Sequence, residues 1–162
     1  MKSNATMALA LCFAVLGTGI EARADCKHVR GSNVETIIPS PNDPFGRVLG
    51  IVNGVLNGAS TTVVTSSSPD GLHATSLDVF VTNKGDILTA TGVVTLTPAP
   101  GSSSEFTEYA ILTITGGSGK YQGASGTITL EGKAVFDSSG GGTFDVIYKG
   151  SVCGPNVKGE GD

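Results

Sequence analysis

Apolar and polar residues alternate with a period of two along most of the chain after residue 47. The clearest case is residues 127–134 (TITLEGKA), where Ile128, Leu130 and Ala134 are separated by threonine, glutamate and lysine. Successive side chains of a β-strand point to opposite faces, so this alternation predicts a strand with one buried and one solvated face. Residues 142–152 repeat the pattern, which Ile147 breaks.

Valine, isoleucine and threonine dominate this part of the chain, with short polar turns between the apolar stretches, and this composition favours strands. The predicted strands are residues 47–57, 59–66, 72–82, 86–97, 106–115, 127–134 and 142–152, and residues 34–38 can form an eighth. Gly92 lies midway along one of them and predicts a bend or bulge there. The turn sequences Ser68 to Gly71 and Asn83 to Asp86 predict hairpins between successive strands.

A meander of about eight twisted strands removes its exposed edges by closing on itself. We therefore predict an all-β domain over residues 47–153, a single antiparallel eight-stranded barrel, with a two-sheet sandwich as the main alternative. Residues 25–46 contain three prolines and are predicted to form an extended N-terminal arm. Residues 154–162 are predicted to form a flexible C-terminal tail.

Residues 111–132 are rich in glycine, which raises the question of a phosphate-binding loop. The spacing fits neither a dinucleotide-binding fingerprint nor a P-loop, and the segment leads into a predicted strand rather than a helix. Glycine also permits backbone conformations that a β-carbon forbids. We predict structural roles in a tight connection, in which Tyr121 packs against the barrel end, for five glycines: Gly116, Gly117, Gly119, Gly123 and Gly126.

Residues 116–132 (GGSGKYQGASGTITLEG) resemble a glycine-rich segment of the allene oxide cyclase and dirigent-like barrels. In that segment G-G-[ST]-G is followed by a pair of residues that contains an aromatic one and then by x-G-A-x-G. The resemblance is specific over this segment and extends more broadly to the strand order from Arg47 to Cys153. It is strongest to secreted bacterial members with no assigned reaction. It implies an eight-stranded antiparallel barrel with a cavity for a small apolar ligand, while the matching glycines carry no catalysis.

The first residues have the features of a secretory signal peptide. A lysine precedes an apolar run over residues 7–16, and Ala22-Arg23-Ala24 offers a cleavage site. The run is shorter than the roughly 20 residues that a membrane-spanning helix needs, so we expect no stable membrane span. The prediction is a signal peptide over residues 1–24 and a secreted or periplasmic protein.

Two cysteines, Cys26 and Cys153, remain after such a cleavage, one near each end of the chain. Compartments outside the cytoplasm are oxidising, so we predict a disulfide between these two cysteines rather than a metal or redox site. The chain has no C-x-x-C pair and only two histidines, and we expect neither a metal nor a cofactor. Its net charge of −4, with scattered acidic residues, lacks the clustered basic face that nucleic acid requires.

Few polar side chains are placed to act on a ligand inside such a barrel. Tyr148 shares the predicted dry face of its strand, and Tyr109, Arg47 and His73 are the other candidate ligand-binding residues. Asp78 alternates with two apolar residues, and we expect it to face solvent. Glu105 and Glu108 fall on opposite faces of one strand, which makes them weak as a paired acid and base. No Ser-His-Asp set can be assembled from the spacing.

Three functions are consistent with these observations. The first is a barrel that binds a small apolar molecule without chemistry of its own, and the second is an extracellular interaction module with a filled barrel, a role that allows a homo-oligomer. The third is a cyclase or isomerase that acts on a lipid-like or polyene substrate inside the barrel. The scarcity of polar residues suited to catalysis favours the two functions without catalysis.

Overall fold

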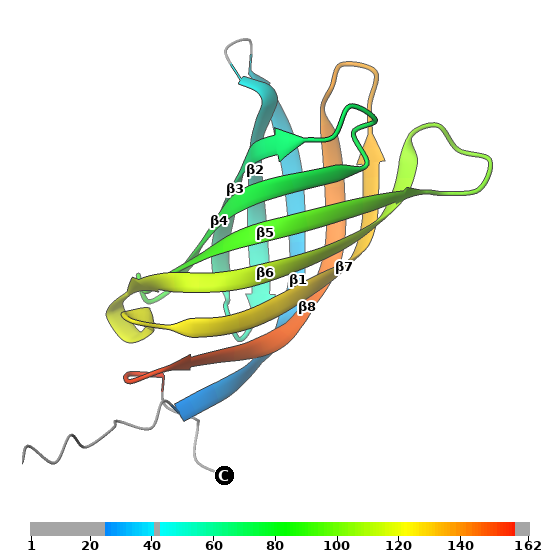
Figure 1. Ribbon diagram of the computed structural model, residues 1–162. Coiled ribbons are helices and arrows are strands. Elements are labelled where there is room, and N and C mark those ends of the chain that lie inside the picture. The colour runs from blue at the N-terminus through cyan, green and yellow to red at the C-terminus, as the bar shows by residue number, and fades with distance from the viewer. Residues whose placement is uncertain (1–24, 41–42, 158–162) are drawn as a thin grey trace, which may run out of the picture.

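The computed structural model describes residues 25–40 and 43–157, and it contains a closed barrel of eight antiparallel strands that neighbour one another in chain order. Figure 1 shows the strands crossing the barrel at a slant. Their bounds are β1 (Asp25–Ser40), β2 (Asp43–Gly54), β3 (Gly58–Ser67), β4 (His73–Thr82), β5 (Ile87–Pro98), β6 (Glu105–Ser118), β7 (Ser125–Phe136) and β8 (Gly142–Gly154). The all-β barrel prediction is confirmed, and the sandwich is excluded.

The first strand extends the predicted barrel towards the N-terminus. Residues 25–40 and 43–46 are extended, as expected for an arm, but they belong to β1 and β2 and pair with neighbouring strands. β1 runs antiparallel to β8 from Asp25 opposite Gly154 to Ile37 opposite Gly142, and it pairs with β2 on its other edge. The ladder shifts register between Ile38 and Ser40, next to Pro39, because proline cannot donate a ladder hydrogen bond and is tolerated at such irregularities.

The two ends of the barrel differ in what closes them (Figure 1). We call one the loop end, where the connections 68–72, 99–104 and 137–141 lie. We call the other the terminus end, where the short turns 55–57 and 83–86, the 3₁₀ turn Gly119–Tyr121 and the described chain ends lie. The hairpin turns are as predicted: Gly71 N–H donates to Ser68 O at 2.9 Å, and Gly85 adopts a φ of +81°.

The half of the barrel next to the terminus end is a packed apolar core. Inward-facing side chains from several strands fill it, among them Val52, Leu88, Leu112, Ile128 and Val152, all of which are fully buried. Each alternates along its strand with an outward residue, so the period-two pattern places a column of apolar groups inside the barrel.

Three residues from connecting segments close this core at the terminus end. Leu56, Tyr121 and Val157 are each buried and belong to the same apolar cluster. The expected packing of Tyr121 against the barrel end is thus confirmed. The part of the predicted C-terminal tail that the structure describes is packed rather than loose, because Gly154 ends β8 and Val157 lies against the core, while residues 158–162 lie outside the described residues. The predicted signal peptide, residues 1–24, also lies outside them.

The glycine-rich connection between β6 and β7 brings neighbouring strands into close contact. A β-carbon at Gly117 would lie 2.0 Å from the carbonyl oxygen of Ile87, and one at Gly126 would lie 2.1 Å from that of Ser151. No real side chain tolerates such contacts, so these glycines let neighbouring strands approach closely. The segment contains only the single 3₁₀ turn Gly119–Tyr121, and β7 follows it at Ser125.

A disulfide joins β1 to β8 across the seam that closes the barrel. Cys26 and Cys153 occupy directly opposed positions of the two strands and form the predicted bond. Such a bond is compatible with an oxidising extracellular or periplasmic compartment. Within the described part of the chain, no helix is long and apolar enough to cross a bilayer.

Candidate ligand-binding site

The barrel interior contains a cavity of about 170 Å³ next to the loop end. Most of its wall is aliphatic or aromatic, and polar groups line the remainder. The apolar lining residues are Ile37, Val48, Val64, Ala74, Val94, Leu96, Phe136 and Phe144, and the others are Glu35, Thr62, Ser67, Gly71, Ser76 and Glu108. The interior is therefore divided into a packed apolar half and a hollow half with polar groups.

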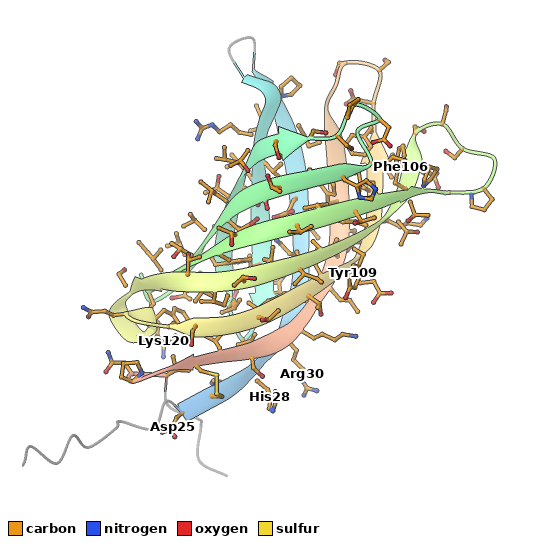
Figure 2. The ribbon with its side chains drawn as sticks, viewed as in Figure 1. Asp25, His28, Arg30, Phe106, Tyr109 and Lys120 are labelled. Atoms are coloured by element: carbon orange, nitrogen blue, oxygen red, sulfur yellow. A yellow bond between two sulfur atoms is a disulfide. The ribbon has the colours of Figure 1, made fainter. Side chains whose placement is uncertain are left out.

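Aromatic side chains surround the cavity at the loop end. Phe136 packs edge-to-face against Phe106, with ring centroids 5.4 Å apart, and against Phe144 at 5.8 Å. Two of these rings line the cavity, and Figure 2 shows Phe106 near the same end of the barrel. Edge-to-face pairs hold such rings in fixed positions, so this part of the wall is preorganised.

Polar side chains separate the cavity from the apolar core, and the first group of them comes from β1 and β3. Asn33, Glu35 and Ser60 are all buried. The Asn33 Nδ2 group donates to Glu35 Oε1 at 2.7 Å, and the Ser60 hydroxyl donates to the same oxygen at 3.0 Å. Burial raises the pKa of Glu35, these hydrogen bonds lower it in part, and the charge of Asp78 raises it further.

The second polar group comes from β3 and β4. The Thr62 hydroxyl donates to Asp78 Oδ1 at 2.6 Å, and the Ser76 hydroxyl donates to Asp78 Oδ2 at 2.7 Å. Both carboxylate oxygens of Asp78 are therefore held by donors. Burial nevertheless raises the pKa of Asp78, and the two hydrogen bonds oppose this effect.

Glu108 on β6 is the exception among these buried groups. Its side chain lines the cavity, the residue is only 5% exposed, and its buried Oε2 atom has no hydrogen-bond partner. Burial, followed by the charges of Glu35 and Asp78, raises the pKa of Glu108 to about 8. At neutral pH the carboxyl group is therefore mostly protonated in the empty barrel.

Two glycines make room for these polar side chains. A β-carbon at Gly50 would lie 2.3 Å from Ser60 Oγ and 2.6 Å from Asn33 Oδ1. A β-carbon at Gly92 would lie 2.2 Å from Ser76 Oγ and 2.9 Å from Asp78 Oδ2. The bulge predicted at Gly92 is not found there: the register of β5 against β6 shifts between Thr89 and Ala90, where β6 carries the additional residue Thr115. Gly92 provides space for the polar group, which explains a glycine at this inward position.

The charges around the cavity are all of one sign. No lysine, arginine or histidine lines it, so within the described ranges Glu35 and Glu108, with Asp78 close enough to affect the pKa of both, have no basic neighbour in the cavity wall. In the same residues, no group of three or more histidine, cysteine or acidic side chains is arranged to hold a metal ion.

The four candidate ligand-binding residues from the sequence are not brought together, and none lines the cavity. Tyr148 is buried as expected, but its hydroxyl accepts from Leu56 N–H and donates to Asn53 O, both at 2.9 Å, which fixes the turn after β2. Tyr109 lies on the outer surface at 46% exposure (Figure 2). Arg47 and His73 are also exposed. Their binding role stays a prediction that the cavity does not support.

Asp78 was expected to face solvent, and this expectation is wrong. The residue does point away from Leu77 and Val79, as its alternation with them indicates, but Leu77 is the outward residue at 50% exposure and Asp78 is the inward one at 6%. The prediction that Glu105 and Glu108 occupy opposite faces is confirmed, because Glu105 is exposed and Glu108 is buried. Alternation alone indicates the two faces of a strand and leaves open which of them is inside.

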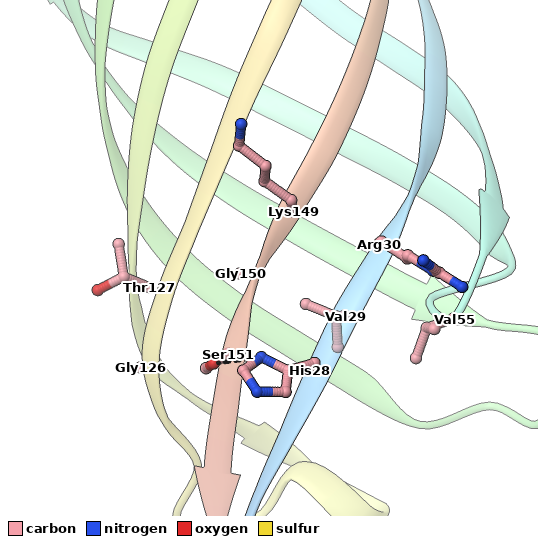
Figure 3. Close-up of a pocket in the computed structure, with 9 residues that line it drawn as sticks. All are labelled: His28, Val29, Arg30, Val55, Gly126, Thr127, Lys149, Gly150 and Ser151. Carbon is pink, nitrogen blue, oxygen red and sulfur yellow. Dashed lines mark hydrogen bonds between the residues drawn. The ribbon is translucent and has the colours of Figure 1, made fainter.

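A larger and more open depression of about 900 Å³ lies beside β1, β7 and β8 (Figure 3). The exposed side chains of His28, Arg30 and Lys149 border it, and His28 Nδ1 lies 3.1 Å from Ser151 Oγ. Val29, Val55, Gly126, Thr127 and Gly150 line the remainder. Exposed charges on a strand surface bind solvent ions weakly. The interior cavity, with its buried unpartnered carboxyl group, is therefore the stronger candidate site.

Comparisons of the chain with protein-family models, with curated proteins and with solved structures find no match.

Proposed function

We propose that this barrel binds a small, mostly apolar molecule in the cavity at its loop end. The observation that supports this most strongly is the combination of an apolar wall with the unpartnered Glu108 carboxyl group in the same cavity. Ligand sites in proteins are typically apolar cavities with a few polar groups that orient the ligand. A filled barrel would bury leucine or phenylalanine here, as the other half of this barrel does.

The cavity volume limits the size of the ligand. A cavity of about 150 Å³ with an aliphatic and aromatic lining holds one benzene molecule. The cavity here, at about 170 Å³, accordingly holds a six-membered ring with one or two further non-hydrogen atoms. It encloses only a part of a lipid-like or polyene chain. This argues against the cyclase alternative, and the resemblance to allene oxide cyclase and dirigent-like barrels stays a prediction.

Binding of cyclohexanol and methylcyclohexane tests the proposed function. Both are rings with one non-hydrogen substituent, and ligand-observed NMR detects weak binding of such probes. We expect both to bind the wild type, and we expect Val94→Phe to abolish binding because the larger ring fills the cavity. The matched control is Val93→Phe, which adds the same ring at the neighbouring, outward-facing position and should leave binding unchanged.

The proposed function is contradicted if neither probe binds, or if both bind equally well to the wild type and to Val94→Phe. Thermal denaturation of each variant shows whether it is folded, since overpacking costs about 1 to 3 kcal/mol.

An interaction module is a second candidate, because the outer surface of the barrel exposes apolar side chains. Val34, Ile51, Ala59 and Val81 occupy paired positions across β1 to β4, and Ile51 is 68% exposed. Apolar surface of this kind is typical of contact surfaces between chains. Light scattering should then show a homo-oligomer that Ile51→Lys dissociates, whereas a monomer at all concentrations would contradict this role.

A further inference from the structure

When Glu108 is ionised, the polar part of the cavity accepts hydrogen bonds and provides little to donate them. Two acidic side chains line it, Glu35 from β1 and Glu108 from β6, and Asp78 from β4 lies close enough to raise the pKa of both. The strands that flank β6 place Leu96 and Gly132 opposite Glu108, and neither residue is ionisable. The hydroxyl donors Ser60, Thr62 and Ser76 are already directed at Glu35 and Asp78.

We infer that the ligand of this cavity carries a primary ammonium group, which enters first and binds Glu108 together with Glu35, while its apolar body contacts the aromatic wall. This inference rests on the proposed function and names the chemical class of the ligand. An ammonium group has three N–H donors and no acceptor, which complements a site that has acceptors to spare. Glu108 Oε2, which is buried and without a partner, is the acceptor that the empty barrel leaves unused.

The charges of the buried carboxyl groups also favour a cationic ligand, independently of hydrogen bonding. Burying a carboxylate is costly unless an opposite charge accompanies it, and no basic side chain lines this cavity. A cation brought by the ligand therefore supplies the missing partner. A neutral alcohol can donate one hydrogen bond but brings no charge, and an apolar ring does neither.

Binding of the cation must be coupled to loss of a proton from the protein. In the empty barrel at pH 7, Glu108 is mostly the neutral acid, and pairing with an ammonium group favours its carboxylate. The complex forms as Glu108 releases its proton to solvent, while the amine keeps its own, because alkylammonium groups have a pKa of about 10. The affinity for an amine should therefore rise between pH 6 and pH 8.5, whereas the affinity for a neutral ligand of the same shape should not.

The test compares three probes of one shape, cyclohexylamine, cyclohexanol and methylcyclohexane, by isothermal titration calorimetry at pH 6.0 and pH 8.5. At pH 8.5 we expect cyclohexylamine to bind about tenfold or more tightly than cyclohexanol, as charge-assisted hydrogen bonds are stronger than neutral ones. At pH 6.0 the advantage should fall several-fold. Titrations in buffers of different ionisation enthalpy should show proton release near pH 7 with the amine alone.

Glu108→Gln tests which residue carries the preference. This variant keeps the side-chain shape and removes the ionisable group, so the advantage of the amine should shrink and its pH dependence should disappear. Glu131→Gln, an exposed glutamate on β7, is the matched control and should behave as the wild type.

The inference is overturned if the amine binds no more tightly than the alcohol at pH 8.5, or if Glu108→Gln keeps the full advantage of the amine. In both cases binding of cyclohexanol and methylcyclohexane would leave the proposed function intact. If none of the three probes binds, the proposed function fails and the inference fails with it.

Discussion

The Glu108→Gln variant will be more stable than the wild type at pH 9, by roughly 3 to 5 kcal/mol in the free energy of unfolding. The pKa of Glu108 rises from 4.5 to about 8 on folding, so the folded protein holds this proton over a pH range in which the unfolded chain has lost it. As the pH rises through this range, the wild type loses stability. The unfolded chain ionises freely, whereas the folded protein must either take up a proton from a solution of low proton concentration or bury a carboxylate. Glutamine cannot ionise and avoids this cost.

The difference between the two proteins should depend on pH with a definite sign. Well below pH 4.5, Glu108 is protonated in both the folded and the unfolded state, so the variant should have little advantage. The advantage should grow from about pH 5 to pH 8 and level off above it. The pKa values of Glu35 and Asp78 are also raised, so both residues lower the stability of the wild type and of the variant alike as the pH rises.

Urea denaturation at pH 5, 7 and 9 measures this difference, with Glu131→Gln as the control for removing an exposed negative charge. Equal stability of the wild type and Glu108→Gln at pH 9 would mean that Glu108 is solvated in the folded protein.

Removal of the disulfide should change the free energy of unfolding by about as much as Glu108→Gln does at pH 9, but in the opposite direction. Replacing both cysteines, Cys26→Ala with Cys153→Ala, should lower the free energy of unfolding by about 4 to 5 kcal/mol, the chain-entropy value for a loop of more than a hundred residues. The bonded cysteines are 127 positions apart, so the crosslink restricts nearly the whole described chain in the unfolded state. The bond also holds the β1–β8 seam at its terminus end.

Denaturation of the oxidised wild type, the reduced wild type and the double variant measures this effect. The last two should be equally unstable, and hydrogen exchange should increase first in residues 25–31 and 148–154, which pair across the seam. A double variant with the denaturation midpoint of the oxidised wild type would show that the ladder between β1 and β8 holds the barrel closed without the crosslink.

Much of the architecture follows from the sequence for local physical reasons. The hairpin turns, the alternation within each strand and the two cysteines at the chain ends predict the barrel and its crosslink. β1 is harder to identify, because Asn33 and Glu35 stand at its inward positions and Val34 at an outward one. Its pattern is therefore the reverse of an ordinary half-buried strand, and the neighbouring prolines suggest an unpaired arm.

The acidic residues of the candidate site are also hard to predict from the sequence, because they occupy inward positions next to exposed apolar residues. On β4, Asp78 is inside and Leu77 outside, and on β6, Glu108 is inside while Tyr109 and Ile111 are outside. Charged residues are almost never fully buried without a partner, so a reading of the sequence places these carboxyl groups in solvent. Only the closure of the sheet, which decides the inward face of all strands together, reveals that Glu35 and Glu108 line one cavity and that Asp78 is buried near them. The neighbouring apolar residues Leu77, Tyr109 and Ile111, which are exposed, are the signal in the sequence that the acidic side chains face inward.

Site-specific NMR titration of the Glu108 side-chain carboxyl carbon measures whether this group is buried without a partner, on which the proposed site depends. The Glu108→Gln variant identifies the signal. We expect a midpoint near pH 8, well above the usual value for glutamate. A midpoint near pH 4.5 would show a solvated carboxylate and would contradict the buried site.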